Sequence, residues 1–179
     1  MQKIVIVSLL SLFAATPAWA DNTGKPYVAA DLGSATYSNL SPFPNPGVFR
    51  IAGGYHLSPA MAVELGYSKF GDSTVNGPSG SATISAHSFQ IALVGSVPLS
   101  AEFDLIGKVG LAANKADGSN TALSTVSTSQ NSPMYGVGAQ FHINQQVSIR
   151  AQYDNYGKFE SGSPAMAAHA VYAGLAYDF

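Results

Sequence analysis

The chain of 179 residues contains no cysteine and has few charged side chains. Without disulfides, the fold must be held by backbone pairing and side-chain packing. Asp, Glu, Lys and Arg make up only 10% of the residues, whereas soluble domains average about 25%. The formal net charge is −2 and no basic stripe is present, so nucleic acid is excluded as a partner.

Long apolar runs are also absent beyond residue 20, so no membrane-spanning helix is predicted. The first residues differ from the rest: Lys3 precedes an apolar run over 4–15, and 18–20 is a small-x-small cleavage site. This pattern is typical of a secretory signal peptide that is exported through the Sec pathway and then removed. We therefore expect residues 1–20 to be a signal peptide and residues 21–179 to form one domain, with a net charge of −3 after the loss of Lys3.

What the chain does have is strict alternation. Every second residue from Val171 to Phe179 is apolar, and the residues between them are small or polar. Such alternation indicates a strand with one apolar face. The pattern recurs along the chain and predicts eight strands, at 26–37, 48–56, 60–70, 83–97, 102–113, 133–143, 147–156 and 168–179.

The two faces of these strands differ in charge. The apolar face carries no charge except Lys69 near one end, whereas the opposite face carries Asp31, Arg50, Glu64, Asp104, Lys108, Arg150, Asp154 and Asp178. A charge on a lipid-facing position at mid-membrane costs about 2–4 kcal/mol, and a water-soluble barrel would have the reverse pattern. We therefore predict an all-β fold, an eight-stranded antiparallel up-and-down transmembrane β-barrel.

The connections alternate between short and long. Turns near 57–59, 99–101 and 144–146 are short, whereas 38–47, 71–82, 114–132 and 157–167 are predicted to be long polar loops. Barrels of the bacterial outer membrane have this asymmetry, with short periplasmic turns and longer outer loops. Aromatic residues near the strand ends are predicted to form two interfacial girdles, namely Tyr55, Phe103, Phe141 and Phe179 at the periplasmic ends and Tyr37, Phe70, Tyr135 and Tyr153 towards the outer ends.

Several short motifs resemble the transmembrane domain of the outer-membrane protein A family. They are residues 53–55 with Pro59 and 64–67, Leu32-Gly33, Pro98, residues 149–153 and the terminal Tyr177-Asp178-Phe179. The resemblance covers essentially the whole mature chain and implies an eight-stranded OmpA/OmpX-like barrel. It also implies assembly by the outer-membrane insertion machinery, which recognises a terminal strand with Tyr177 and Phe179. Because the sequence ends at Phe179, we do not expect the periplasmic peptidoglycan-binding domain of full-length family members.

Inward charges are the candidate functional residues. Glu64 and Arg150 lie at similar heights on strands that face each other across a barrel whose interior side chains just fill, and both match inward ion pairs of the resembled family. Asp31, Lys108 and Gln140 are expected to join them in a lumen polar network. Such a network is either a satisfied polar core or a gate in a narrow pore, and we favour the polar core.

No catalytic site, metal or cofactor is predicted. The four histidines have no HxxH or HExxH spacing. His87 and Ser88 are adjacent on a strand and must point to opposite faces, which is poor geometry for a nucleophile and its base. His169 with Asp154 or Glu160 has no supporting spacing, so a lipid-modifying enzyme remains only the least favoured alternative.

The leading functional prediction is a structural or adhesin-like surface protein, with a narrow or gated pore as the alternative. Residues 121–128 are rich in β-branched side chains and either extend two strands beyond the membrane, offering an edge to a partner, or form a polar loop. The expected partners are outer-membrane lipids and lipopolysaccharide, the insertion machinery and a host or surface ligand bound by the outer loops. A monomer is expected.

Overall fold

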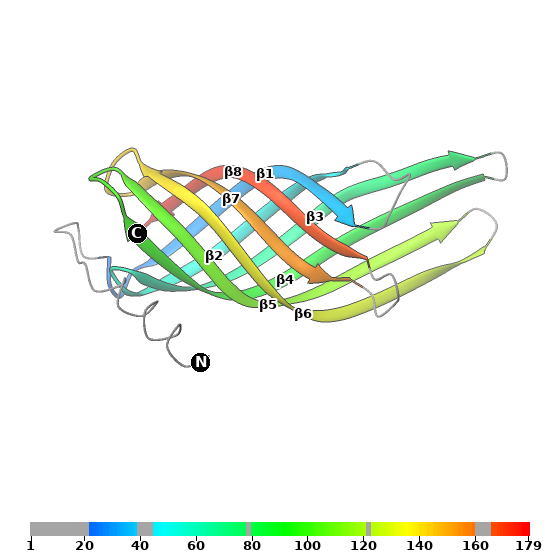
Figure 1. Cartoon of the computed structure of the whole chain (residues 1–179), viewed down its shortest axis with the longest axis horizontal. Coiled ribbons are helices and arrows are strands. Elements are labelled where there is room, and N and C mark those ends of the chain that lie inside the picture. The colour runs from blue at the N-terminus through cyan, green and yellow to red at the C-terminus, as the bar shows by residue number, and fades with distance from the viewer. Residues whose placement is uncertain (1–21, 39–44, 78–79, 121–122, 160–165) are drawn as a thin grey trace, which may run out of the picture.

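The computed structural model describes residues 22–38, 45–77, 80–120, 123–159 and 166–179. These residues form eight strands: β1 (Pro26–Ser38), β2 (Gly47–Ser58), β3 (Met61–Gly77), β4 (Gly80–Pro98), β5 (Phe103–Asn120), β6 (Leu123–His142), β7 (Val147–Lys158) and β8 (Ala167–Asp178). Each strand pairs antiparallel with the next, and β8 pairs with β1 (Figure 1). The predicted closed eight-stranded barrel is therefore confirmed.

The two ends of the barrel differ in their connections. Residues 59–60, 99–102 and 143–146 form short turns at one end, which we call the turn end. The first and last strands also meet there, because Tyr27 pairs with Asp178. The opposite end, the loop end, carries the β1–β2, β3–β4, β5–β6 and β7–β8 connections (Figure 1). No described helix is long and apolar enough to cross a membrane.

Two of the expected loops are mostly strand. The prediction of a loop at 71–82 is wrong, since β3 and β4 remain paired out to Gly77 and Gly80. The prediction at 114–132 is wrong in the same way, because β5 and β6 remain paired out to Asn120 and Leu123. Polar residues mask these extensions in the sequence, although Ser and Thr side chains pair well across strands, as the 2.9 Å contact between Thr74 Oγ1 and Thr83 Oγ1 illustrates.

The extended parts of β3, β4, β5 and β6 form a sheet beyond the rest of the barrel. This protruding sheet consists of 72–77, 80–86, 116–120 and 123–130 (Figure 1). The suggestion that 121–128 extends two strands is confirmed for 123–128; residues 121–122 lie outside the described part of the chain.

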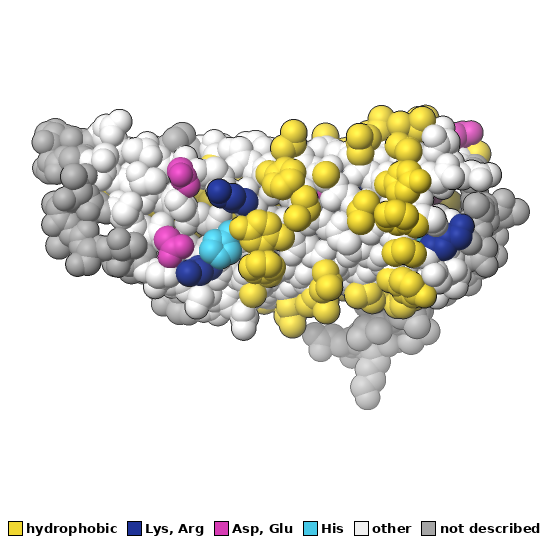
Figure 2. Space-filling model, turned by 180° about the vertical axis from the view of Figure 1, so that it is seen from behind, with side chains coloured by type: hydrophobic (Ala, Val, Ile, Leu, Met, Phe, Trp, Pro, Cys, Tyr) yellow, Lys and Arg dark blue, Asp and Glu magenta, His cyan; other side chains and the backbone are white. Residues whose placement is uncertain are grey.

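The outer surface of the barrel is an apolar belt. The side chains that alternation assigned to the lipid face are exposed or partly exposed, for example Leu32 at 68% and Leu65 at 61%. The charged set assigned to the other face points inward, and Asp31, Arg50 and Glu64 are buried. On the face seen in Figure 2, the hydrophobic side chains form a band across the barrel, with charged side chains on either side of it.

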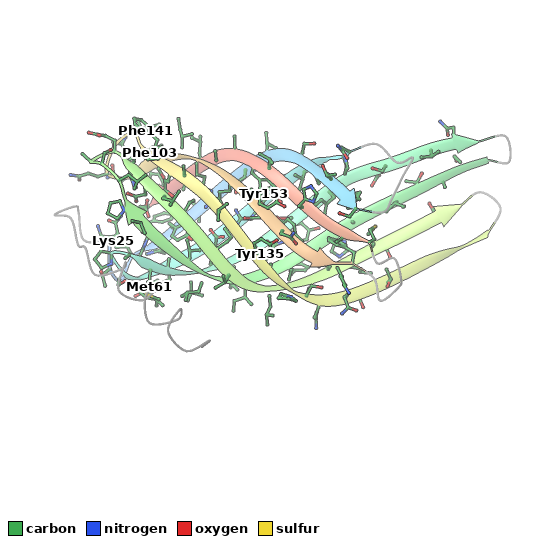
Figure 3. All side chains as sticks on the ribbon, viewed as in Figure 1. Lys25, Met61, Phe103, Tyr135, Phe141 and Tyr153 are labelled. Carbon is green, nitrogen blue, oxygen red and sulfur yellow. The ribbon has the colours of Figure 1, made fainter. Side chains whose placement is uncertain are left out.

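The girdle prediction is only partly correct. Phe103 and Phe141 are cross-strand partners on the outside at the turn end, and Tyr135 and Tyr153 lie farther towards the loop end (Figure 3). Phe70 instead points into the barrel and is fully buried, and Tyr37 packs against the same interior cluster. The girdle prediction is therefore wrong at these two positions, because it considered height along the strand without regard to the face.

Candidate functional site

The middle of the barrel interior is filled by a charged network built around two arginines. Arg50 Nη1 lies 2.8 Å from Asp31 Oδ2, and Arg50 Nη2 also contacts Glu64. Arg150 reaches the same two carboxylates from the other side, with Nε 2.7 Å from Asp31 Oδ1 and Nη1 3.2 Å from Glu64 Oε2. The two guanidinium groups thus join β2 and β7 to β1 and β3 across the lumen.

Lys108 and Asp154 complete this lumen network. Lys108 Nζ lies 3.2 Å from Glu64 Oε1 and 3.4 Å from Asp154 Oδ2. Tyr27 donates its hydroxyl proton to Glu64 Oε2 at 2.9 Å. Three cationic and three carboxylate side chains therefore balance in charge, and all of them are buried.

Charge balance and further hydrogen bonds limit the cost of burying these groups. Removing one charge from water costs several kcal/mol, and a buried pair offsets that cost only with good geometry and further hydrogen bonds. Glu64 has both, since it accepts from Arg50, Arg150, Lys108 and Tyr27. Most polar atoms of the network are therefore paired, although Arg50 Nε and Asp154 Oδ1 are buried without a hydrogen-bond partner.

Two glycines provide the space that the network occupies. A Cβ on Gly136 would meet Asp154 Oδ1 and would lie 2.9 Å from Lys108 Cγ. A Cβ on Gly174 would meet Asp31 Oδ1. Gly136 is the cross-strand partner of Lys108 and Asp154, and Gly174 is that of Asp31 and Arg150, so the sheet carries no side chain where the long charged ones cross.

The interior towards the loop end is closed by an aromatic cluster. Phe70 packs edge-on against Tyr156 and Phe159, with ring centroids 5.4 and 5.5 Å apart. Tyr37 adds a further edge contact with Phe159. We call these four residues the aromatic plug. The Tyr156 hydroxyl contacts Ser68 Oγ at 2.9 Å, so the plug borders the polar interior on its turn-end side.

The interior towards the turn end is open by comparison. A cavity of about 490 Å³ is lined by residues of all three short turns and ends at Glu64, Lys108 and Arg150. Its lining does not include the aromatic plug. We call this cavity the vestibule. The lumen network closes it on the side that faces the loop end.

Two histidine–aspartate pairs lie at the mouth of this vestibule. His56 Nε2 is 2.8 Å from Asp178 Oδ1, and His142 Nε2 is 3.1 Å from Asp104 Oδ2. Both pairs lie at the rim of the turn end, where they link neighbouring or nearby strands.

The structure brings most of the candidate residues together. Asp31, Glu64, Lys108 and Arg150 meet in the lumen network, whereas Gln140 lines the vestibule and forms no hydrogen bond with them among the described residues. Tyr177 and Phe179 lie on the outer belt with their rings 5.1 Å apart.

Arg50, Asp154 and Tyr27 belong to the lumen network but were not predicted as part of it. Arg50 and Asp154 are on the inward face in the sequence pattern, so their direction was correctly inferred. The missing information was their height, which depends on strand register. Arg50 is the direct cross-strand partner of Asp31, a pairing that the alternation alone does not specify.

His87 and Ser88 point to opposite faces of β4, as the alternation predicts, and Glu160, which was considered beside His169, lies outside the described residues. Ser88 is buried and donates its hydroxyl proton to Asn114 Oδ1 at 2.7 Å, while His87 lies against the ring of Tyr67 on the outer face. His169 stacks near Tyr153, with ring centroids 5.7 Å apart. Among the described residues, no three His, Asp or Glu side chains are grouped closely enough to hold a metal ion.

Comparison with known proteins agrees with this architecture. The model of the outer membrane protein beta-barrel domain family matches residues 5–179. A search of the curated proteins finds no match.

Solved structures with the same fold include neisserial surface protein A, which has a TM-score of 0.67 at 18% identity over 86% of this chain and 97% of that one. The attachment invasion locus protein Ail of Yersinia pestis, solved with the heparin analogue sucrose octasulfate, gives 0.64 at 18% identity over 88% and 99%. The N-terminal barrel of Pseudomonas aeruginosa OprF gives 0.63 at 13% identity over 88% and 100%. At these identities the similarity concerns the fold alone, whereas the family model covers nearly the whole sequence. The chain therefore belongs to the outer membrane protein beta-barrel family.

Proposed function

We propose that this outer-membrane barrel is a surface-interaction protein whose protruding sheet contacts a partner outside the cell. The observation that carries the proposal is the continuation of β3 to β6 well beyond the strands on either side. The barrel is the anchor and the sheet is the contact surface. The loop end faces outward in this proposal, because short turns are periplasmic in outer-membrane barrels.

The sheet supports binding through its edges. β2 pairs with β3 only as far as Phe70, and β7 pairs with β6 only from Tyr135 onward. The backbone of 74–77 on one side and 123–129 on the other therefore pairs with no further strand in the described part of the chain. An extended partner segment adds to such an edge through main-chain hydrogen bonds.

A polypeptide strand suits these edges better than a sulfated glycan. The solved Ail structure holds a heparin analogue, but the described charged side chains of the protruding sheet are Asp72 and Asp117. Two carboxylates repel sulfate groups. Main-chain pairing needs no basic side chain, which favours a peptide segment as the ligand.

Shortened hairpins test the proposal without disturbing the barrel. Because Ser73 pairs with Ile84, and Ala116 with Thr128, residues 74–83 and 117–127 can each be replaced by Asn-Gly, which forms a two-residue hairpin turn. Bacteria that express this variant should lose adhesion to epithelial cells and to immobilised matrix proteins, while the heat-modifiable barrel stays at wild-type level. Equal adhesion of the variant and the wild type would contradict the proposal.

The second candidate, a narrow pore, is favoured by the vestibule alone. Its closed end at Glu64, Lys108 and Arg150, followed by the aromatic plug, supports a sealed barrel instead. Planar-bilayer recordings should therefore show no conductance for the wild type. Reproducible channel openings, enlarged by Phe70→Ala, would favour the pore.

Three further features belong to the proposal: export through the Sec pathway with removal of residues 1–20, a non-enzymatic role and a monomeric barrel. The apolar run before 18–20 and the family membership support export. N-terminal sequencing of the purified membrane protein should begin at residue 21.

A further inference from the structure

A short basic row crosses the outside of the barrel at the loop-end border of the apolar belt. Lys69 on β3 pairs with His87 on β4, which pairs with Lys115 on β5. All three side chains point outward, and neighbouring strands lie about 4.8 Å apart, so the row spans about 10 Å. On the face seen in Figure 2, basic and histidine side chains gather at this border, and acidic side chains lie farther towards the loop end.

The two lysines of the row have no internal counter-charge. Neither forms an ion pair with a carboxylate among the described residues. The nearest acidic residues along the strands, Asp72 and Asp117, lie farther out on the protruding sheet, and Asp72 accepts a hydrogen bond from Ser85 Oγ at 2.6 Å. The row therefore presents positive charge at one depth, between the belt and the acidic residues.

An aromatic pair of the belt lies next to the row, on its turn-end side. Tyr67 and Phe89 are cross-strand partners with ring centroids 4.7 Å apart, and Tyr67 lies 6.1 Å from the His87 ring. Aromatic side chains of this kind mark the membrane–water interface. Lys69 and Lys115 are consequently placed at the depth of lipid head groups.

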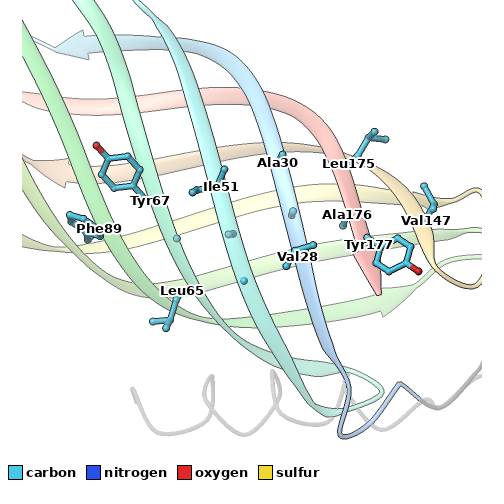
Figure 4. Close-up of a pocket in the computed structure, with 14 residues that line it drawn as sticks. Val28, Ala30, Ile51, Leu65, Tyr67, Phe89, Val147, Leu175, Ala176 and Tyr177 are labelled. Atoms are coloured by element: carbon cyan, nitrogen blue, oxygen red, sulfur yellow. The ribbon is translucent and has the colours of Figure 1, made fainter. Parts of the chain in front are cut away.

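An apolar groove begins under this pair and runs down the barrel wall. Its volume is about 800 Å³, and its lining includes Tyr67, Phe89, Leu65 and Val28 (Figure 4), together with the small residues Ala30 and Gly53. The groove faces lipid, so a straight hydrocarbon chain is the occupant that fits its shape and polarity. A phosphate at the row and an acyl chain in the groove would belong to one molecule.

We propose that Lys69, His87 and Lys115 bind the phosphate groups of an outer-leaflet glycolipid of the lipopolysaccharide type, with one of its acyl chains in the groove. Lysine ammonium groups bind phosphate as point charges, and basic residues at membrane depth recognise anionic head groups. The acidic residues beyond the row disfavour a phosphate farther out, which fixes the depth of the lipid. This inference rests on the proposed outward orientation of the loop end.

Native mass spectrometry of the detergent-solubilised full-length protein tests the site. Bisphosphorylated lipid A should be retained by the wild type, and the double variant Lys69→Gln/Lys115→Gln should bind it about tenfold more weakly. The variant Lys158→Gln is the matched control, since it removes an exposed charge at the loop end outside the row. Its binding should stay within about twofold of the wild type. Equal binding by the double variant and the wild type would overturn the proposal.

Two ligand arms identify the source of the phosphate. Lipid A without phosphates should bind the wild type as weakly as bisphosphorylated lipid A binds the double variant, and inorganic phosphate should not compete. If sucrose octasulfate binds through the two lysines as strongly as lipid A does, the row is a site for soluble polyanions and the proposal is wrong. The groove is tested by Gly53→Leu, which is expected to fold because a Cβ there meets nothing closer than Tyr27 O at 3.9 Å. This variant should retain less lipid A, and unchanged retention would remove the acyl chain from the proposal.

The outcome is separable from that of the proposed function. Binding in detergent does not depend on orientation or on the protruding sheet. Loss of lipid A binding with normal adhesion would affect only the lipid site, and loss of adhesion in the shortened-hairpin variant leaves the two lysines in place.

Discussion

At the residue scale, Arg50 connects the two carboxylates on which the lumen network depends. It contacts Asp31 and Glu64 directly, and its Nε lies 4.0 Å from Asp154 Oδ2. Arg150 makes a second set of contacts with Asp31 and Glu64. Each of these carboxylates therefore has more than one cationic partner, so the loss of one arginine removes contacts with both carboxylates without leaving either of them unpaired.

Changes at Glu64 and Arg150 should affect the free energy of unfolding in a partly dependent way. Glu64→Gln and Arg150→Met each leave the buried charges unbalanced by one, and breaking a buried pair costs about 3–5 kcal/mol. The double variant should recover only part of the loss, because Arg50 and Lys108 still lack the Glu64 carboxylate. Urea unfolding of the refolded barrel measures this, and losses that simply add would show that the two residues do not interact.

Gly136 should be sensitive to a single methyl group. Gly136→Ala places a Cβ against Asp154 Oδ1 and Lys108 Cγ, and overpacking of this kind costs about 1–3 kcal/mol. Gly107→Ala is the matched control, because nothing lies within 4 Å of its Cβ position. The midpoint of urea unfolding should fall for the first variant and not for the second. Equal midpoints for the two variants would mean that the lumen network rearranges around the added methyl group without a loss of stability.

At the scale of strands, the alternation predicted whether a side chain points into or out of the barrel. It predicted the lengths of the strands, and the positions of residues along the barrel axis, much less well. The inward position of Asp31, Glu64, Lys108 and Arg150 follows from a period of two residues. The continuation of β3 beyond Phe70 does not, because its polar side chains are typical of both loops and exposed strands. Contacts across the lumen need the register between neighbouring strands, so Arg50 was placed on the right face but outside the predicted network.

The last strand should also be sensitive at its end. Deletion of Phe179 should lower the amount of heat-modifiable barrel in the membrane, because the insertion machinery of the resembled family reads a terminal aromatic residue. Phe179 packs against Tyr177 on the belt, and its backbone N–H donates to Pro26 O at 3.1 Å. Semi-native electrophoresis of membrane fractions measures the effect.

The control for this deletion is Phe141→Ala, which removes an exposed aromatic side chain at the same end of the barrel. If the deletion acts only through a general loss of interfacial anchoring, both variants should have equally reduced amounts of heat-modifiable barrel. If Phe179 is a specific assembly signal, only its deletion should lower the amount of heat-modifiable barrel. A normal amount in the deletion variant would contradict the role assigned to Phe179.

At the scale of the whole molecule, the barrel is asymmetric along its axis. The vestibule opens at the turn end, the lumen network closes its middle, and the aromatic plug lies below the protruding sheet. The basic row and the groove are on the outer wall of the barrel, between the protruding sheet and the turn end. The proposed roles of the sheet and of the lipid site both depend on one orientation in the membrane, so that orientation is the property most worth measuring.

Single cysteines measure the orientation directly, because the chain has none of its own. Asn76→Cys and Ser127→Cys place an exposed thiol on the protruding sheet, and Gln145→Cys places one in a short turn. With the loop end outward, a membrane-impermeant maleimide should label the first two on intact cells and should label Gln145→Cys only after the outer membrane is permeabilised. All three thiols should react in the purified protein, which controls for accessibility. Labelling of Gln145→Cys on intact cells, together with protection of the other two, would reverse the orientation and would place the protruding sheet and the basic row in the periplasm.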